Sequence, residues 1–587
     1  MVARRQKKAD RIKRQPVAVP SFVWRRRAVV ALFVMAGSVL IWRGVDQQVL
    51  ERDFLQSEGA DRYLERVRQE PRRGIITDRR GEVLALSTPV DSLVADPRLL
   101  RPDAPHLDLL AEALDMPAKE IRERLERYAS RHFMYLRKRL PPGRAEYILK
   151  VAEAGGLEGV HIERKHRRYY PEGEVFAHVL GFTNANDQGQ EGLERAFDGE
   201  LQGEGGQKLV LRDGRRRVVE NVENIRSPRD GSNLALSLDA RLQYFAYREL
   251  KAAVHRHRAV AGSAVLLDAK TGEVLAMVNQ PGFNPNGDRS NKGGRLRNRA
   301  LTDVFEPGST MKPFVVAAAL QQQIVEPSSF IDTSPGRFKV ASLTVRDHDD
   351  LGRIDLRTLL SRSSNVGAAK LALSLDRAGY WGVLDKLGFG HSPLTGYPAE
   401  SSGYLPYFRD WVPVDQATLS YGYGLSASAL QLAGAYAVLA NDGVRLPVSL
   451  LKQEAVPQGE AVLRAPVARA VRHMLEAVTG PEGTAPQAQV HGYRVAGKTG
   501  TVRKLDSNGE YSEHRYRALF AGMAPVSDPR FVMAVVIDEP RGKHYYGGLV
   551  AAPVVSSVIS EALRLLNVPP DGLDKPRVRL AQLRGVQ

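Results

Sequence analysis

The stretch FEPGSTMKPF, Phe305 to Phe314, decides how the rest of the sequence is interpreted. Ser309 and Lys312 stand three residues apart, which on a helix places both side chains on one face. Pro313 is tolerated only in the first turn of a helix, so a helix is predicted to begin near Ser309. A serine becomes a nucleophile when a neighbour takes its proton, and a lysine held neutral by burial can do this. Taken alone, the pair favours an ordinary helix cap followed by a surface lysine.

A second motif follows in SRSSNVGAAKLAL. Ser363 and Asn365 bracket one residue, and two small polar side chains so arranged can share a lysine proton and hold a substrate amide. Ser and Asn are also the preferred residues at a helix N-cap. Alone, this motif favours the cap.

A third motif, GKTGT, comes after a short apolar strand. Lys498, Thr499 and Thr501 offer a cation and hydroxyls to a substrate carboxylate. Gly500 has no side chain and would allow the backbone of a ligand to approach closely. Alone, the motif is equally consistent with a β-turn that carries a solvated lysine.

The order of the three motifs carries more weight than any one of them. Ser-x-x-Lys, Ser-x-Asn and Lys-Thr-Gly occur in this order, 54 and 135 residues apart. The set is typical of β-lactamases and penicillin-binding proteins. The middle motif reads Ser-Ser-Asn where class A β-lactamases have Ser-Asp-Asn. No carboxylate between the second and third motifs is evidently placed to activate water, although Glu400, Glu454 and Glu460 are candidates. A β-lactamase is therefore disfavoured.

The segments around the motifs predict an α+β fold. LALSLDARLQYFAYRELKAAV is a strand followed by a helix, and GSAVLLDAKTGEVLAMV is a hairpin with its turn at residues 269–272. A helix-rich stretch from Ser309 to Ala440 precedes the strands YRVAGKTGT, RALFAGMAP and RFVMAVVID and a last helix, APVVSSVISEALRLL. We expect an antiparallel sheet flanked by helices in residues 231–567. Upstream, HLDLLAEALDMPAKEIRERLERYA predicts two short helices broken near Pro117.

The N-terminus predicts a membrane anchor. Residues 1–27 hold ten Lys or Arg and one Asp, which is +9 of the chain's +17, so the basic charge does not indicate a nucleic-acid partner. AVVALFVMAGSVLIW is uncharged and flanked by arginines that can reach the headgroups, which predicts a transmembrane helix over residues 28–45. A cleaved signal peptide is the alternative, but no small-x-small cleavage site follows. The basic tail is expected in the cytoplasm and the remainder outside it.

The composition limits the chemistry. The chain has no Cys, which excludes disulfides, thiolate metal sites and a Cys nucleophile. Neither a metal nor a cofactor is expected.

In these motifs and their surroundings the chain resembles the class B penicillin-binding proteins, most closely the FtsI type that works at the division septum. RGIITDRRGEVLALS, RRYYPEGEVFAHVLGF and GQEGLERAFDGEL, which contains Glu194, are similar to the N-terminal pedestal of that family. RNRALTDVFEPGSTMKP, YGYGLSASALQLAGAYAVLANDG and GGLVAAP are similar to its catalytic domain. The resemblance implies a cytoplasmic tail (1–27), an anchor (28–45), a non-catalytic, dimerisation-type pedestal (46–230), a β-lactamase-like serine transpeptidase domain (231–567) and a C-terminal tail (568–587).

The resemblance also implies a role for each motif residue. Ser309 would be the acylated nucleophile and Lys312 its general base, while Ser363 and Asn365 would relay protons and hold the peptide amide. Lys498 and Thr499 would steer the terminal carboxylate, with Thr501 beside the acyl group, and Gly500 would be a further substrate-binding residue. The backbone N–H groups of Ser309 and Thr501 would form the oxyanion hole. The implied ligands are the stem peptides of peptidoglycan and β-lactams, and the implied partners are the inner (cytoplasmic) membrane and divisome proteins, including a glycan-polymerising membrane protein.

Several alternatives stay open at this point. The motifs alone do not separate a septal transpeptidase from an elongation-type class B enzyme or a D,D-carboxypeptidase. A glycosyltransferase domain is disfavoured because fewer than 200 residues lie between the anchor and residue 231. A β-lactam sensor would need a cytoplasmic signalling domain, for which residues 1–27 leave no room. A scaffold role could coexist with catalysis.

Overall fold

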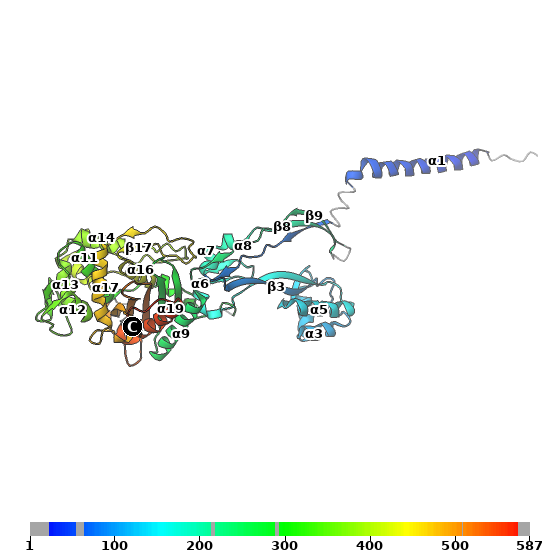
Figure 1. The fold of residues 1–587 in the computed structure, drawn as a ribbon. Coiled ribbons are helices and arrows are strands. Elements are labelled where there is room, and N and C mark those ends of the chain that lie inside the picture. Colours follow the sequence, from blue (N-terminus) through cyan, green and yellow to red (C-terminus); the bar gives the residue numbers. More distant parts are fainter. Residues whose placement is uncertain (1–22, 55–63, 213–217, 288–292, 507–508, 573–587) are drawn as a thin grey trace, which may run out of the picture. The chain divides into compact units, whose positions relative to one another are not determined.

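The computed structural model describes residues 23–54, 64–212, 218–287, 293–506 and 509–572 (Figure 1). The chain divides into two compact units. The first comprises Met1–Gln69 and Gly205–Ser227, and the second comprises Glu70–Glu204 and Pro228–Gln587.

The first unit contains one long apolar helix and a small sheet. Helix α1 (Val23–Val45) carries exposed apolar side chains along its length, such as Phe33 and Leu40. Together with the turn that follows, it is long and apolar enough to cross a membrane, over Val23–Leu50. The predicted segment 28–45 lies inside this range. Strands β1 (Leu64–Gln69), β8 (Gly206–Arg212) and β9 (Val218–Arg226) form an antiparallel sheet in the order β1-β8-β9.

The N-terminal part of the second unit is built on the long strand β3 (Val83–Ala95), which pairs antiparallel with both of its neighbours, β4 (Met134–Leu140) and β5 (Val160–Tyr169). Strands β2 (Ile76–Thr77) and β10 (Leu234–Ala235) extend the same sheet. Apolar residues of β3, such as Leu93 and Ala95, share one core with helices α3 (Leu107–Leu114), α4 (Ala118–Arg127) and α5 (Pro142–Ala154). The predicted pair of helices is confirmed, because α4 begins directly after Pro117, whose fixed φ suits a helix start.

A buried ion cluster stabilises this part. The Glu194 carboxylate is fully buried and accepts hydrogen bonds from Arg73 Nε at 2.8 Å and from Arg168 Nε at 2.6 Å. Arg73 Nη1 also donates to Asp198 at 2.7 Å. The cluster joins the segment before β2, strand β5 and the short helices α7 (Gly192–Ala196) and α8 (Asp198–Gln202). Residues far apart in the sequence are thereby held together.

The C-terminal part of the second unit contains a five-stranded antiparallel sheet in the order β12-β11-β21-β20-β19. Every residue of β11 and β12 is buried, with no alternation, so both faces of the sheet are covered. Helices α9 and α19 pack together against it, and α16 and α17 pack against β11, β21 and β19 (Figure 1). The predicted α+β fold, with its antiparallel sheet and flanking helices, is confirmed. The elements are β11 (Ala261–Asp268), β12 (Val274–Gln280), β19 (Ala496–Leu505), β20 (Tyr511–Ala524), β21 (Phe531–Asp538), α9 (Ala240–Arg256), α16 (Ala429–Ala440), α17 (Ala465–Thr479) and α19 (Ala552–Leu565).

The predicted helix-rich stretch also contains strands that the sequence did not predict. Two separate two-stranded sheets pair β13 with β16 and β14 with β15. Each strand has only three or four residues, too few for an alternating pattern to stand out. The elements of this stretch are α11 (Lys312–Gln321), β13 (Phe330–Asp332), β14 (Arg337–Val340), β15 (Leu343–Arg346), β16 (Arg353–Asp355), α12 (Leu356–Ser361), α13 (Asn365–Leu373), α14 (Arg377–Lys386) and α15 (Pro413–Leu419).

Candidate active site

Ser309 lies in a 3₁₀ turn, Gly308–Met311, that leads directly into α11. The predicted helix start near Ser309 is therefore correct, and Pro313 stands in the first turn of α11. The alternative of a helix cap is wrong, because Pro307 is the N-cap residue of the turn and Met311 that of α11, and neither end has a side-chain cap. Among the described residues the Ser309 hydroxyl has no hydrogen-bond partner, and the residue is only half-buried. Its hydroxyl is therefore available to a substrate.

The turn that carries Ser309 is held by close backbone contacts. Gly308 has a positive φ of 60°, and its N–H donates to the Gly422 carbonyl at 3.1 Å. A Cβ atom at Gly422 would lie only 2.1 Å from the Gly308 oxygen, so a side chain there would collide with the turn. A Cβ atom at Gly500 would lie 3.1 Å from the Pro307 oxygen. Gly500 therefore lies close to the protein's own backbone at Pro307, and strand β19 packs directly against the turn.

Lys312 is fully buried at the start of α11. Its Nζ lies 2.5 Å from the Ser363 carbonyl oxygen, 3.0 Å from Ser363 Oγ and 2.7 Å from Asn365 Oδ1. Burial, together with the positive charge of Lys498, holds the pKa of Lys312 well below its ordinary value. The first two motifs, separated by some 50 residues of sequence, therefore meet at one nitrogen atom.

In the second motif neither Ser363 nor Asn365 is the residue that caps the following helix. The residue that caps α13 is Ser364, whose Oγ accepts from the Gly367 N–H at 2.9 Å. Ser363 has a positive φ of 60°, which is uncommon for a residue other than glycine. Because Ser364 performs the capping, Ser363 and Asn365 are free to direct their side chains at Lys312.

Asp347, just after β15, is a residue of the site that the sequence did not single out. Its carboxylate accepts from Ser364 Oγ and from the backbone N–H of Asn365, both at 2.5 Å, and from the Val366 N–H at 3.0 Å. A carboxylate at the N-terminus of a helix satisfies N–H groups that have no partner within the helix. Asp347 therefore fixes the start of α13, and with it the position of Asn365. No sequence motif surrounds it.

The third motif lies on β19, an edge strand of the five-stranded antiparallel sheet. Lys498 is fully buried, and its Nζ donates, among the described residues, to the carbonyl and hydroxyl oxygens of Thr499, each at 3.2 Å. Burial lowers the pKa of Lys498 to about 7. Thr499 Oγ1 lies 3.0 Å from Thr484 Oγ1, and Thr501 Oγ1 accepts from the Gly547 N–H at 3.2 Å. The structure thus brings all three motifs together around Lys312 and the turn of Ser309.

The carboxylates that the sequence offered as a hydrolytic base are engaged elsewhere or exposed. Glu400 accepts from the N–H groups of Thr395 at 2.9 Å and Tyr397 at 3.1 Å, so it closes its own loop. Glu454 and Glu460 are exposed. These contacts support the expectation that the site is not that of a β-lactamase.

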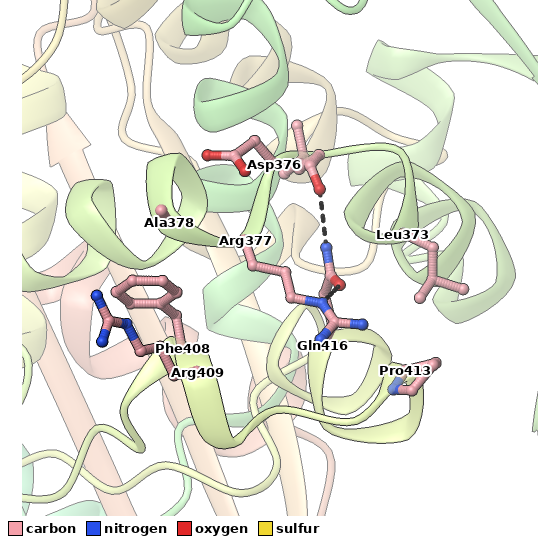
Figure 2. A pocket seen from close by; sticks show the side chains of 9 residues that line it. Leu373, Asp376, Arg377, Ala378, Phe408, Arg409, Pro413 and Gln416 are labelled. Atoms are coloured by element: carbon pink, nitrogen blue, oxygen red, sulfur yellow. Dashed lines mark hydrogen bonds between the residues drawn. The ribbon is translucent and has the colours of Figure 1, made fainter.

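A cavity of about 600 Å³ on the helical part contains none of the motif residues (Figure 2). Arg377 extends across it and donates to Gln416 Oε1 at 3.1 Å and to the Trp411 carbonyl at 2.7 Å. Gln416 in turn donates to the Ala372 and Leu375 carbonyls. The polar groups at its centre bond to one another, which indicates a structural role. Within the described residues no cluster of His, Asp and Glu is suited to hold a metal ion.

A serine hydroxyl with no partner in the described part of the chain, one helical turn before a buried lysine of lowered pKa and at the edge of an antiparallel sheet, defines a serine enzyme that acts by acyl transfer. The family described as "Penicillin binding protein transpeptidase domain" matches residues 262–560, and the family described as "Penicillin-binding Protein dimerisation domain" matches residues 68–236. The chain therefore belongs to the penicillin-binding protein transpeptidases of class B. The predicted family and enzyme class, a serine D,D-transpeptidase, are confirmed.

Similar proteins include a curated relative and two solved structures. The peptidoglycan D,D-transpeptidase FtsI of Escherichia coli is 40% identical over 572 residues, 96% of either chain. The transpeptidase domain of penicillin-binding protein 3 from Burkholderia pseudomallei is 43% identical, with a TM-score of 0.53, and covers 57% of this chain and 97% of its own. Penicillin-binding protein 3 from Mycobacterium tuberculosis, in complex with aztreonam, is 28% identical, with a TM-score of 0.67, and covers 86% and 98%.

Proposed function

We propose that this protein cross-links peptidoglycan stem peptides at the division septum through an acyl-serine on Ser309. The observation that carries the proposal is the environment of Lys312, a buried amine whose pKa lies well below its ordinary value and which is held by the second motif. A lowered pKa increases the neutral fraction of this amine, and only the neutral amine can accept the proton of Ser309.

Acylation follows from this arrangement. As Ser309 Oγ bonds to the carbonyl carbon of the D,D-peptide bond, its proton passes to Lys312 Nζ. The neutral amine donates to the Ser363 carbonyl and to Asn365 Oδ1, and its lone pair remains to take that proton. When the tetrahedral intermediate collapses, the C–N bond breaks and the leaving amine needs a proton. Ser363 Oγ, 3.0 Å from Lys312 Nζ, would pass a proton from the lysine to this amine.

The third motif supplies binding and charge stabilisation. In its protonated form Lys498 would attract the terminal carboxylate of the substrate, and the hydroxyls of Thr499 and Thr501 would donate to it. Among the described strands β19 pairs only with β20, so some of its backbone N–H groups can bind the substrate. The N–H groups of Ser309 and Thr501 would stabilise the oxyanion.

The second step distinguishes a cross-linking enzyme from a hydrolase. Glu400 is engaged in its own loop, and among the described residues no contact brings exposed Glu454 or Glu460 to Ser309, so the ester should persist until an acceptor amine arrives. With a β-lactam the leaving portion stays tethered, and the adduct should be long-lived.

Mass spectrometry of the intact protein tests this proposal. After excess β-lactam is removed, the mass increase should persist for hours and should map to Ser309. In the presence of stem peptides and an acceptor amine, cross-linked peptide should form. Return to the free mass within seconds, or release of the terminal residue without cross-linking, would indicate a β-lactamase or a D,D-carboxypeptidase instead.

We also propose a membrane location and protein partners. Helix α1 would hold the protein in the inner membrane as a single span, with its arginine-rich end in the cytoplasm and the catalytic domain in the periplasm. The septal role, and association with a glycan-polymerising membrane protein and other divisome components, are supported by the similarity to FtsI. If the role is septal, depletion should block division while the cells continue to elongate. Loss of rod shape would favour the elongation-type alternative.

A further inference from the structure

A second pocket, of about 660 Å³, lies on the sheet built around β3. One face of that sheet packs on α3, α4 and α5, and the other face forms the floor of the pocket. In the antiparallel registers Val90 lies opposite Lys165, and Val94 lies opposite Tyr135, so these side chains share that second face. The turn at residues 184–186 and the loop at residues 285–287, which follows β12, complete the walls.

The walls of this pocket carry many positive groups and no carboxylate. We call it the cationic pocket, and its charged and titratable lining residues are Lys138, Arg139, Lys165, His166, Arg167 and Arg168. Two carboxylates lie beside it: Glu163, 3.3 Å from Lys165 Nζ, and Asp187, which follows the lining turn and accepts from Ser87 Oγ at 2.8 Å. Within the described part of the chain, Lys138, Arg139 and Arg167 have no carboxylate partner. Positive groups gathered without counter-charges repel one another, so their arrangement favours an anionic ligand.

The contacts of these cations leave them available. Lys138 Nζ lies 4.1 Å above the ring of Tyr135, and Arg167 Nη2 donates to the carbonyl of Asn286 at 3.0 Å. Both contacts hold a side chain in place without neutralising its charge. Arg139 is exposed and has a positive φ of 63°, which is uncommon for a residue other than glycine.

A buried nitrogen atom of Arg168 also indicates an anionic ligand. Arg168 lines the pocket, and its side chain is only 1% exposed. Its Nε and Nη1 donate to Glu194 and to the Gly74 carbonyl, but its buried Nη2 has no hydrogen-bond partner among the described residues. Buried donors are almost always satisfied, so an orphan nitrogen in the wall of a pocket indicates a missing acceptor.

We propose that the cationic pocket binds the carboxylates of uncross-linked peptidoglycan strands, as a site separate from Ser309. The inference rests on the proposed function, because the substrate of the catalytic domain is itself a carboxylate-bearing peptide on a glycan. Amide groups and the rings of Tyr135 and Tyr170 line the pocket beside the cations, which suits a sugar–peptide ligand better than an isolated anion. The pocket would hold a strand close to the catalytic domain while Ser309 is occupied.

The test uses the full-length protein in detergent, with Ser309 first acylated by penicillin. The probe is a soluble disaccharide–peptide fragment of uncross-linked peptidoglycan, and its binding is measured by calorimetry. Binding should persist in the acylated protein and should weaken as salt is added. Acylation itself reports on the proposed function, so failure there is distinguishable from failure of the pocket.

Matched variants locate the binding. K138E combined with R139E should weaken binding by at least about tenfold, since both cations become anions. R167Q should weaken it less. K150E, an exposed lysine on α5 outside the pocket, should leave it unchanged. The rate of penicillin acylation should be normal in all three, which shows that they are folded.

Three outcomes would overturn the proposal. The first is no binding to the acylated protein, and the second is equal binding by K138E/R139E. The third is equal or tighter binding of inorganic phosphate, of a poly-glutamate peptide or of glycan stripped of its peptides, since the pocket would then recognise another class of ligand.

Discussion

The Asp347 carboxylate accepts a hydrogen bond of 2.5 Å from the backbone N–H of Asn365, the residue whose side chain holds Lys312. Asp347 has no chemistry of its own in the proposed mechanism, but it fixes the helix end from which Asn365 projects. It is therefore a positioning residue.

Asp347→Ala should slow acylation of Ser309 by β-lactams on the order of tenfold or more, because three hydrogen bonds at the start of α13 are lost. The free energy of unfolding should fall by about 1–3 kcal/mol, the usual cost of leaving such donors unsatisfied. Stopped-flow acylation and chemical denaturation measure the two effects. Asp349→Asn, at an exposed neighbour, is the control and should change neither.

Ser309→Ala should abolish covalent labelling by penicillin. Its free energy of unfolding should change by less than about 0.5 kcal/mol, since the hydroxyl has no partner among the described residues and caps no helix. Labelling with fluorescent penicillin and thermal unfolding check both statements. Labelling that persists at full strength would exclude Ser309 as the nucleophile.

The two buried lysines should give a bell-shaped pH profile of acylation by a carboxylate-bearing β-lactam. Lys312 must be neutral to accept a proton, so the rate rises as pH rises through its lowered pKa. Lys498 must be charged to attract the carboxylate, so the rate falls as pH rises through about 7.

Arginine substitutions separate these two roles. Lys312→Arg should nearly abolish acylation, because a guanidinium stays protonated. Lys498→Arg should retain more activity and lose the decline above pH 7. Equal losses in both variants would argue against the division of roles.

The lowered pKa of Lys498 also predicts how stability depends on pH. Between about pH 7 and its ordinary value of 10.5, the unfolded state binds more protons at this residue than the folded state. The free energy of unfolding should therefore rise with pH across this window, by up to about 1.4 kcal/mol per unit. Lys498→Met should lack this contribution, so the difference between wild type and variant isolates it. Denaturation at pH 7 and pH 9.5 provides the measurement.

Glu194→Ala should be strongly destabilising, by about 3–5 kcal/mol, since Arg73 and Arg168 would remain buried without their carboxylate. Denaturation of the variant measures this loss. Glu200→Ala, at an exposed carboxylate on α8, is the matched control. A loss of less than about 1 kcal/mol would show that water or nearby carbonyls compensate.

Topology is testable without an enzyme assay. A reporter that is active only outside the cytoplasm, fused after Gln587, should be active. Removal of residues 1–42 should yield a soluble protein that still binds penicillin. An inactive reporter would contradict a single span with the N-terminus inside.

Much of the fold could be predicted because its signals are local. The runs RFVMAVVID and GSAVLLDAKTGEVLAMV are apolar enough to predict buried strands. Pro117 and Pro313 predict helix starts, because proline is tolerated at the start of a helix and not in its interior. The strands of the two small sheets near Asp347 were missed, because three or four residues carry too short a pattern.

The sequence by itself determined the family and the order of the motifs and predicted the reactive residues, since these depend on residue type and spacing along the chain. Only the tertiary structure decided that Ser364 caps α13, which leaves Ser363 and Asn365 free to bind Lys312. The same is true of the bond from Asp347 to the start of that helix and of the contact between Gly500 and the Pro307 carbonyl. It also applies to the cations from β4 and β5 that share one pocket. Each of these depends on a contact between segments brought together by packing. Such contacts leave no periodic pattern in the sequence, because a buried donor needs an acceptor at one point in space and not at one interval along the chain.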